Sequence, residues 1–190
     1  MIQHPIKGKI LFNLYKFQED TLRELRDNRF NIILKSRQMG ISTLTAGYAL
    51  HCLMFQDDFN VLVIATTQEV AKNLVAKVQL MYEFLPSFLK QGLSIVNNNK
   101  LQLTFSNGST IKAVSSNPDS ARSNALSLLI CDEFAFTPDA EAIWTSAQAT
   151  LSTGGKAILL STPNGIGGQF HQIWQKAEEG IAEPGMERFN

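Results

Sequence analysis

Residues 30–43 read FNIILKSRQMGIST, an apolar run followed directly by a polar loop that contains a glycine and several hydroxyl side chains. The run from Phe30 to Leu34 is short and continuous, which predicts a buried strand, and the stretch from Ile41 to about Met54 predicts a helix. Phosphate-binding loops lie in strand–loop–helix units of this kind, because the loop amides and the helix N-terminus face the anion. The segment therefore predicts both a local fold and a candidate site.

The rest of the chain alternates strands and helices in the same way. Further strands are expected at 61–65, 126–131 and 156–161, and helices at 19–27, 68–84, from Pro138 onward and at 168–179. Two β-prone runs, 101–105 and 109–114, flank Asn107-Gly108, the strongest short hairpin signal. Uncharged strands separated by helices predict an α/β fold with a mostly parallel central sheet flanked by helices. Ligands bind such sheets at the carboxyl ends of the strands, so the informative loops follow residues 34, 65, 131 and 160.

Composition sets limits on the class of protein. The chain has 190 residues, of which 44% are hydrophobic, and its 17 basic and 17 acidic residues give zero net charge. This length suits one domain, or one domain and the start of another, and the apolar content excludes a disordered tail. Zero net charge excludes a strongly basic nucleic-acid arm. No apolar run approaches a membrane span. Cys52 and Cys131 have neither metal nor disulfide spacing, so a cytosolic chain with reduced thiols and no membrane partner is expected.

The loop after the first long strand departs from the phosphate-loop pattern G-x-x-x-x-G-K-[ST]. Gly40 and Ser42 occupy the last glycine and the hydroxyl, whereas Ile41 stands at the lysine position. Either Lys35 or Arg37 would supply the cation that the β- and γ-phosphates need, and Ser42 would bind Mg²⁺. The other interpretation is a polar strand-to-helix turn whose charges face solvent. The candidate nucleotide-binding residues of the loop are Lys35, Ser36, Arg37, Gln38, Met39, Gly40, Ile41, Ser42 and Thr43.

Two adjacent carboxylates follow the apolar run at 126–131. In a Walker B segment, Asp132 would hold the Mg²⁺ of the nucleotide and Glu133 would polarise the attacking water. Phosphoryl transfer needs both roles close to the γ-phosphate. An acidic turn after a strand is the alternative. A phosphate loop on another strand of the same sheet favours the Walker B interpretation.

Three residues near the N-terminus suit adenine recognition. Tyr15, Phe17 and Gln18 are expected just before the first helix, which leads to the strand of the loop. Adenine offers an apolar face and paired hydrogen-bonding groups, which aromatic rings and a side-chain amide complement. The aromatic pair is equally compatible with closing an edge of the core.

Two further segments flank the expected site. Arg122 lies in a polar stretch before the strand at 126–131, where it is either a solvated charge or an arginine finger that acts on a neighbouring subunit. Ser161 and Thr162 end the strand at 156–161, beside the expected γ-phosphate position. Their hydroxyls would sense the phosphate or its water, or would cap a turn.

Together these segments resemble the large terminase subunit of tailed bacteriophages, in its N-terminal packaging ATPase. The resemblance rests on Ser36-Arg37-Gln38-x-Gly40, Asn107-Gly108-Ser109, Ser116-x-Pro118-Asp119-x-x-Arg122, Ile130-x-Asp132-Glu133-x-Ala135-Phe136 and Ser161-Thr162-Pro163-Asn164-Gly165, in the family's order. It implies a P-loop NTPase of the ASCE (RecA/helicase-like) type with ATP and Mg²⁺ as cofactors.

The resemblance also implies roles for the matching positions. Residues 35–42 are similar to the family's deviant Walker A loop, and Gln18 with its aromatic neighbours is similar to the adenine motif. Asp132 and Glu133 match Walker B and the catalytic carboxylate. Ser161-Thr162 matches the coupling motif, and Arg122 falls where a trans-acting finger is proposed in related motors. Many members keep a lysine where Ile41 stands, and some carry it at the start of the loop, as Lys35 does here.

The family also implies an organisation and partners. Residues 1–180 would form the packaging ATPase domain and 181–190 the start of a linker or lid, with the C-terminal nuclease domain of a complete subunit absent from this chain. The expected partners are double-stranded DNA, a portal protein, a small terminase subunit and copies of the chain in a homo-oligomeric ring, in the host cytoplasm. The alternatives are a superfamily 2 helicase-like remodelling ATPase and, because of Ile41, a non-hydrolysing nucleotide-binding scaffold.

Overall fold

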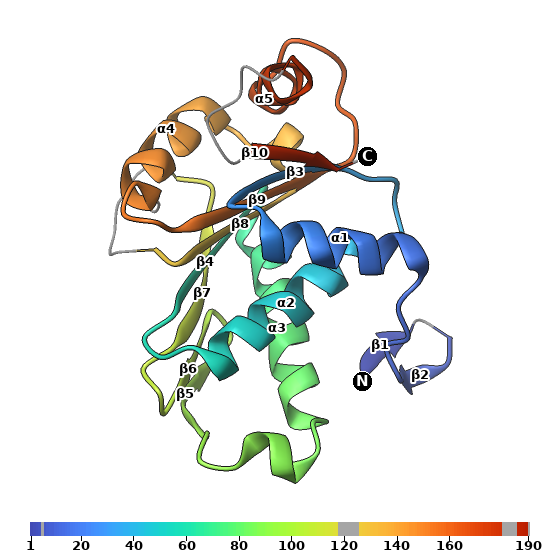
Figure 1. Cartoon of the computed structure of the whole chain (residues 1–190), viewed down its shortest axis with the longest axis vertical. Helices are drawn as coiled ribbons and strands as arrows, with labels where there is room; N and C mark the ends of the chain where they lie inside the picture. The colour runs from blue at the N-terminus through green and yellow to red at the C-terminus, as the bar shows by residue number, and fades with distance from the viewer. Residues whose placement is uncertain (5, 118–125, 180–185, 190) are drawn as a thin grey trace.

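An eight-stranded sheet forms the centre of the molecule in the computed structural model, which describes residues 1–4, 6–117, 126–179 and 186–189 (Figure 1). Its strands lie in the order β10-β3-β9-β8-β4-β7-β6-β5. The bounds are β3 (Phe30–Leu34), β4 (Asn60–Ala65), β5 (Ile95–Asn99), β6 (Gln102–Phe105), β7 (Thr110–Ser115), β8 (Leu128–Asp132), β9 (Lys156–Ser161) and β10 (Met186–Phe189). The strands from β10 to β7 are parallel, and β6 and β5 continue the sheet in antiparallel fashion. The predicted α/β fold with a mostly parallel sheet is confirmed.

Helices cover both faces of this sheet. They are α1 (Lys16–Asp27), α2 (Ile41–Phe55), α3 (Gln68–Glu83), α4 (Ala140–Leu151) and α5 (Gln169–Glu178), with short 3-10 turns at Ser87–Lys90 and Phe134–Phe136. Figure 1 shows α1, α2 and α3 on one side of the sheet and α4 and α5 on the other. A separate two-stranded sheet pairs β1 (Ile2–His4) with β2 (Gly8–Ile10). None of the described helices has the length and apolar character needed to span a membrane.

The strand β4 illustrates why the sheet is apolar on both faces. Successive side chains along a strand point to opposite faces of the sheet, so each strand contributes to the apolar core on both faces. Val61, Val63 and Ala65 pack in the cluster that contains α1, α2 and α3, whereas Leu62 and Ile64 pack in the cluster that contains α4 and α5. The scarcity of charge within the predicted strands, where only Lys112 and Lys156 are charged, follows from this double burial.

The register of the parallel strands brings their carboxyl ends to one edge. Leu34 pairs with Ser161, and Asp132 pairs with both Leu160 and Ala65. The loops that follow β3, β4, β8 and β9 therefore begin side by side, as the alternation of strands and helices predicted. This edge is where the candidate site lies.

Most predicted elements end within two residues of the observed bounds, but the first helix does not. It begins at Lys16 and not at Glu19, so Phe17 and Gln18 lie in its first turn, and the expectation that they precede it is wrong. The Gln18 side-chain Oε1 accepts the Tyr15 backbone N–H at 3.1 Å, which satisfies one of the free donors at the helix start.

The hairpin was predicted, but two further strands of the sheet, β5 and β10, were not. Asn107-Gly108 joins β6 to β7 as expected, and β7 then pairs parallel with β4 inside the main sheet. β5 was not predicted, because its sequence IVNNN is mostly polar. β10 lies within the segment 181–190 and pairs with β3 at the edge of the sheet. The division of the chain at residue 180 stays a prediction.

Candidate active site

The loop between β3 and α2 contains two residues with left-handed backbones. Gln38 and Gly40 both adopt left-handed conformations, with φ of 62° and 72°, and Gly40 is the N-cap of α2. A Cβ at Gly40 would lie only 2.7 Å from Nε2 of Gln18, so the position requires glycine for both reasons. The backbone N–H of Lys35 donates to the carbonyl of Ser161 at 2.9 Å and joins the start of the loop to β9.

A small pocket of about 200 Å³ lies at this loop. It is lined by Lys35, Ser36, Gln38, Met39, Gly40, Ile41, Ser42, Thr43 and Lys77. Nearly all the predicted loop residues therefore line one cavity. Arg37 is absent from its lining, and the Arg37 side chain is exposed.

Gln18 ties the first helix to this loop. Its side chain is 2% exposed, and Nε2 donates to the carbonyl of Met39 at 2.8 Å. The rings of Tyr15 and Phe17 stack in parallel with centroids 5.8 Å apart, and Tyr15 is 69% exposed. Adenine recognition by these residues stays a prediction. Of the three, Gln18 contacts the loop, through its hydrogen bond to Met39.

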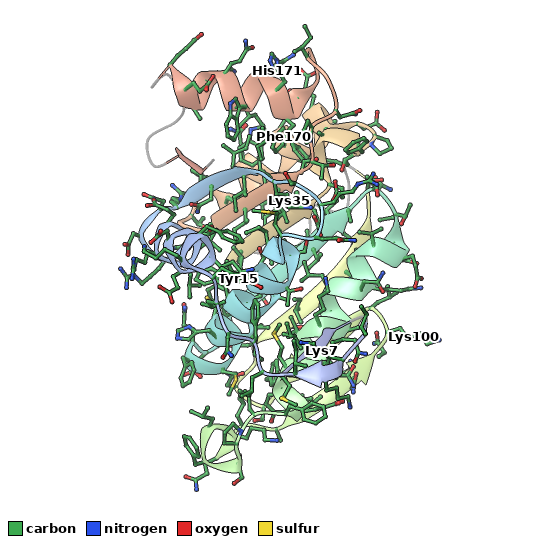
Figure 2. The ribbon with its side chains drawn as sticks, turned by 90° about the vertical axis from the view of Figure 1, so that its right-hand side faces the viewer. Lys7, Tyr15, Lys35, Lys100, Phe170 and His171 are labelled. Atoms are coloured by element: carbon green, nitrogen blue, oxygen red, sulfur yellow. The ribbon has the colours of Figure 1, made fainter. Side chains whose placement is uncertain are left out.

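A cluster of charged side chains occupies the carboxyl ends of β3 and β8. Lys35 Nζ lies 2.8 Å from Glu133 Oε1 and 3.6 Å from Asp132 Oδ1, although these residues are far apart in sequence. The Lys35 side chain is 9% exposed. Figure 2 shows Lys35 in the middle of the molecule, whereas Lys100 lies at its periphery. Ion pairs with little solvent contact need close geometry to offset desolvation, which this cluster provides.

Glu133 is held from two sides. Its Oε1 accepts from Lys35, and its Oε2 accepts from the Thr162 hydroxyl at 3.1 Å and from the Thr162 backbone N–H at 3.4 Å. Partial burial alone would raise the pKa of Glu133, but the hydrogen bond and charge of Lys35, together with the Thr162 donors, lower it below its ordinary value. The residue also has a left-handed backbone, with φ of 54°. An ionised carboxylate is thus fixed in one position at the edge of the sheet.

The predicted pair Ser161 and Thr162 has two different sets of partners. Ser161 is 0% exposed, and its Oγ accepts the backbone N–H of Ala135 at 3.1 Å. Thr162 instead contacts Glu133, as described above. Asn164 donates to the carbonyl of Ala135 at 2.8 Å, so the segment after β9 is fastened to the turn after Glu133.

Asp132 and Ser42 are the predicted Mg²⁺ ligands, and their chemistry fits that ion. Asp132 Oδ1 accepts the backbone N–H of Glu133 at 3.0 Å. In the described part of the chain, no group of three or more His, Cys, Asp or Glu could hold a metal by itself. Mg²⁺ is usually held by one or two carboxylates together with waters and substrate phosphates, so a single carboxylate and a hydroxyl suit an ion that binds with the nucleotide.

Lys77 of α3 is a pocket residue that the sequence did not single out. It is partly buried, and burial lowers its pKa, while Asp132 acts to raise it and Lys35 to lower it further. A local signal does exist, because Lys77 follows Leu74 by three positions and so borders the buried face of the helix. Arg122, in contrast, lies outside the described residues, and its role as a finger stays a prediction.

The parallel sheet, the glycine-containing loop after β3 and the carboxylate pair after β8 together define a P-loop NTPase of the ASCE type. The family model described as "Terminase large subunit, T4likevirus-type, N-terminal" matches residues 32–188, which is most of the chain. The protein belongs to this family. The resemblance read from the motifs is therefore confirmed, and the helicase alternative is not supported.

Solved structures agree with this fold. The large terminase ATPase domain of Thermus phage P74-26 matches with a TM-score of 0.74 and 22% identity, covering 94% of this chain and 80% of that one. The HK97 bacteriophage large terminase gives a TM-score of 0.74 at 20% identity over 98% of this chain and 40% of that one. The large terminase of a thermophilic bacteriophage, in complex with ADP, gives 0.72 at 17% identity over 93% and 45%. At these identities the likeness shows the fold.

Proposed function

We propose that this domain hydrolyses ATP with Mg²⁺ and that hydrolysis drives double-stranded DNA into a phage procapsid. Membership in the large terminase family supports a packaging motor. A structurally similar large terminase has been solved in complex with ADP, which supports a nucleotide at this fold. The observation that carries the proposal is the carboxylate of Glu133, held at the sheet edge between Lys35 and Thr162.

The geometry of Glu133 suits the orientation of water. An ionised carboxylate accepts a hydrogen bond from the attacking water and orients it toward the γ-phosphate. Its lowered pKa keeps the acceptor form at neutral pH. The left-handed backbone and the two side-chain partners restrict its position, which favours reaction from one geometry.

The loop and the second carboxylate would bind the phosphates and the metal. Residues 36–43 would cradle the phosphates with their amides at the start of α2. Asp132 and Ser42 would hold Mg²⁺, which when bound neutralises charge on the phosphate oxygens. Tyr15, Phe17 and Gln18 would bind adenine beside the loop.

The assembly is proposed on the family's organisation. The domain would act in a homo-oligomeric ring in the host cytoplasm, with double-stranded DNA, the portal protein and the small terminase subunit as partners. Arg122 of one subunit would then stabilise the transition state at its neighbour, and Ser161-Thr162 would couple hydrolysis to motion. Zero net charge is compatible with this role, because a ring can hold DNA transiently through a few local basic groups.

Phosphate release from ATP, measured with Mg²⁺ and with EDTA over a range of protein concentrations, tests the activity. Glu133→Gln should lower turnover at least about a hundredfold while ATP binding persists, because a positioned acid–base group contributes roughly that much. Glu69→Gln is the matched control, since Glu69 is an exposed residue paired with Lys72 on α3. Turnover that survives Glu133→Gln contradicts its role. ATP binding by the unmodified protein without any release at any concentration would instead favour the non-hydrolysing scaffold.

A further inference from the structure

We propose that Lys77 of α3 supplies the phosphate-contacting charge that is missing from position 41 of the loop. The inference rests on the proposed function, because it concerns the phosphates of the same nucleotide. It names a residue far from the loop in sequence, on a helix to which no phosphate motif was assigned.

Ile41 cannot serve this purpose. It stands where the phosphate-loop pattern has lysine. Ile41 is 4% exposed and packs in the same apolar cluster as Leu44. Position 41, whose side chain in the usual pattern is the lysine that contacts the β- and γ-phosphates, is therefore part of the apolar core here. A triphosphate carries several negative charges, so a second source of positive charge is needed beside it.

The two candidates in the loop are less suitable than they looked from the sequence. Lys35 Nζ already lies within 2.8 Å of Glu133 and 3.6 Å of Asp132. Arg37 is exposed and does not line the pocket. The first is engaged by carboxylates, and the second faces solvent.

Lys77 lines the pocket from the opposite helix. The pocket of about 200 Å³ is bounded by the loop, by Ser42 and Thr43 at the start of α2, and by Lys77. The packing of α2 against α3 in one core cluster fixes Lys77 in this place. A lysine ammonium has three donors and no acceptor, so an anion with several oxygens can both accept its hydrogen bonds and neutralise its charge.

The Lys77 ammonium has no hydrogen bond or ion pair in the described part of the chain. A partly buried cation without a hydrogen-bonded partner is costly, because desolvation is only partly offset, here by the charge of Asp132. The cost is visible as a lowered pKa of the Lys77 ammonium, for which burial is the main cause. A phosphate oxygen in the pocket would remove this cost by pairing with the ammonium and favouring its charged form. The loop amides and Lys77 would then face the same anion from two sides.

Calorimetric titration of the full chain with ATP, ADP and AMP tests this assignment. Lys77→Met should weaken ATP and ADP binding by about 10- to 100-fold, the range expected for one charge-assisted hydrogen bond, and should leave AMP binding within about twofold. Lys77→Arg should retain most of the affinity. Lys72→Met is the matched control, because Lys72 lies on the same helix but pairs with Glu69 outside the pocket.

Thermal unfolding without nucleotide separates binding from folding. Lys77→Met should melt at the same temperature as the unmodified protein or higher, because it removes an unpaired, partly buried charge. A lower melting temperature, or AMP binding weakened as much as ADP binding, overturns the inference. Equal ADP affinity in Lys77→Met and the unmodified protein also overturns it but leaves the proposed function intact. Failure of the unmodified protein to bind any nucleotide overturns the proposed function itself.

Discussion

Two polar regions of this molecule carry family motifs, and they are built in opposite ways. One is the hairpin turn at residues 107–109, and the other is the charged cluster of Lys35, Asp132 and Glu133. Both combine polar side chains with turns at strand ends. They differ in what satisfies the polar atoms.

The polar side chains of the hairpin turn form their hydrogen bonds with backbone groups. Asn107 Nδ2 donates to the carbonyls of Leu53 and Gln56, each at 2.9 Å, and its Oδ1 accepts the N–H of Ser109 at 3.1 Å. Ser109 Oγ donates to the carbonyl of Gln56 at 2.8 Å and accepts the N–H of Phe59 at 3.1 Å. These bonds close the C-terminal end of α2, whose last carbonyls have no partner within the helix. The motif therefore has a structural role.

In the charged cluster, ionised side chains pair with one another, and Thr162 and the Glu133 backbone N–H donate further hydrogen bonds. Lys35 neutralises Glu133 and lies near Asp132, and Glu133 keeps a partly exposed carboxylate. Such an arrangement responds to a bound ion or phosphate, whereas backbone partners do not. The comparison indicates a ligand site at the charged cluster, where the ion pairs can respond to a bound ion, and a structural closure at the hairpin, where the partners are backbone carbonyls and amides.

The largest expected effect is the loss of turnover in Lys35→Met. Removing the ammonium leaves the carboxylates of Glu133 and Asp132 without their cation, so the phosphates would meet uncompensated negative charge. We expect ATP turnover to fall at least about a hundredfold, in the range of one lost electrostatic contact. Arg37→Met is the control and should stay within about threefold, because Arg37 is exposed outside the pocket. The reverse ranking of the two variants would show that Arg37 is the cation of the loop.

Asn107→Ala should have its effect on stability and not on chemistry. The substitution leaves one N–H and two carbonyls with fewer partners, and we expect a loss of about 2 kcal/mol in the free energy of unfolding. Urea denaturation measures it, and turnover per folded molecule should remain unchanged. If Asn107→Ala lowered turnover as much as Lys35→Met does, while its stability stayed normal, the hairpin would be shown to take part in the reaction.

The same contrast explains which features could be predicted from sequence. β3 and β9 were predicted to the residue, because each has a compact, mainly apolar run bordered by polar residues. The rule that parallel strands end at one edge predicted that the loops after β3 and β8 lie together, but the ion pair between Lys35 and Glu133 was not predicted. β5 was not predicted, since a polar strand at the end of a sheet carries no apolar pattern. Lys77 was missed because its spacing from Leu74 indicates only that it borders the buried face of α3, whereas its place in the pocket depends on the loop after β3.

Smaller effects should distinguish Ser161, the last residue of β9, from Thr162, which follows it. Thr162→Val removes the hydroxyl that donates to Glu133 Oε2, and we expect turnover to fall about tenfold with little change in stability. Ser161→Ala removes the buried acceptor of the Ala135 N–H, and we expect a loss of about 1–2 kcal/mol in stability. Steady-state kinetics and urea denaturation of both variants measure the two effects. Equal effects of both variants on turnover would contradict the division of roles between the two hydroxyls.

The smallest expected effect concerns Cys131, which lies next to Asp132 but faces the opposite core. Cys131 packs among the apolar residues near α4 and α5, and burial raises the pKa of its thiol above the ordinary value of 9.0. In the unfolded chain the thiol ionises near pH 9, and in the folded chain it ionises only at higher pH. Its contribution to stability is therefore complete below pH 9 and is lost as pH rises above that value. Cys131→Ser replaces the thiol with a hydroxyl that does not ionise in this range, so its stability should fall less between pH 8 and pH 10 than that of the unmodified protein. Denaturation at pH 8 and pH 10, together with slow labelling of the native thiol by a disulfide reagent, measures it. Rapid labelling at pH 8 would show that the boundary between the charged cluster and the apolar core is open to water.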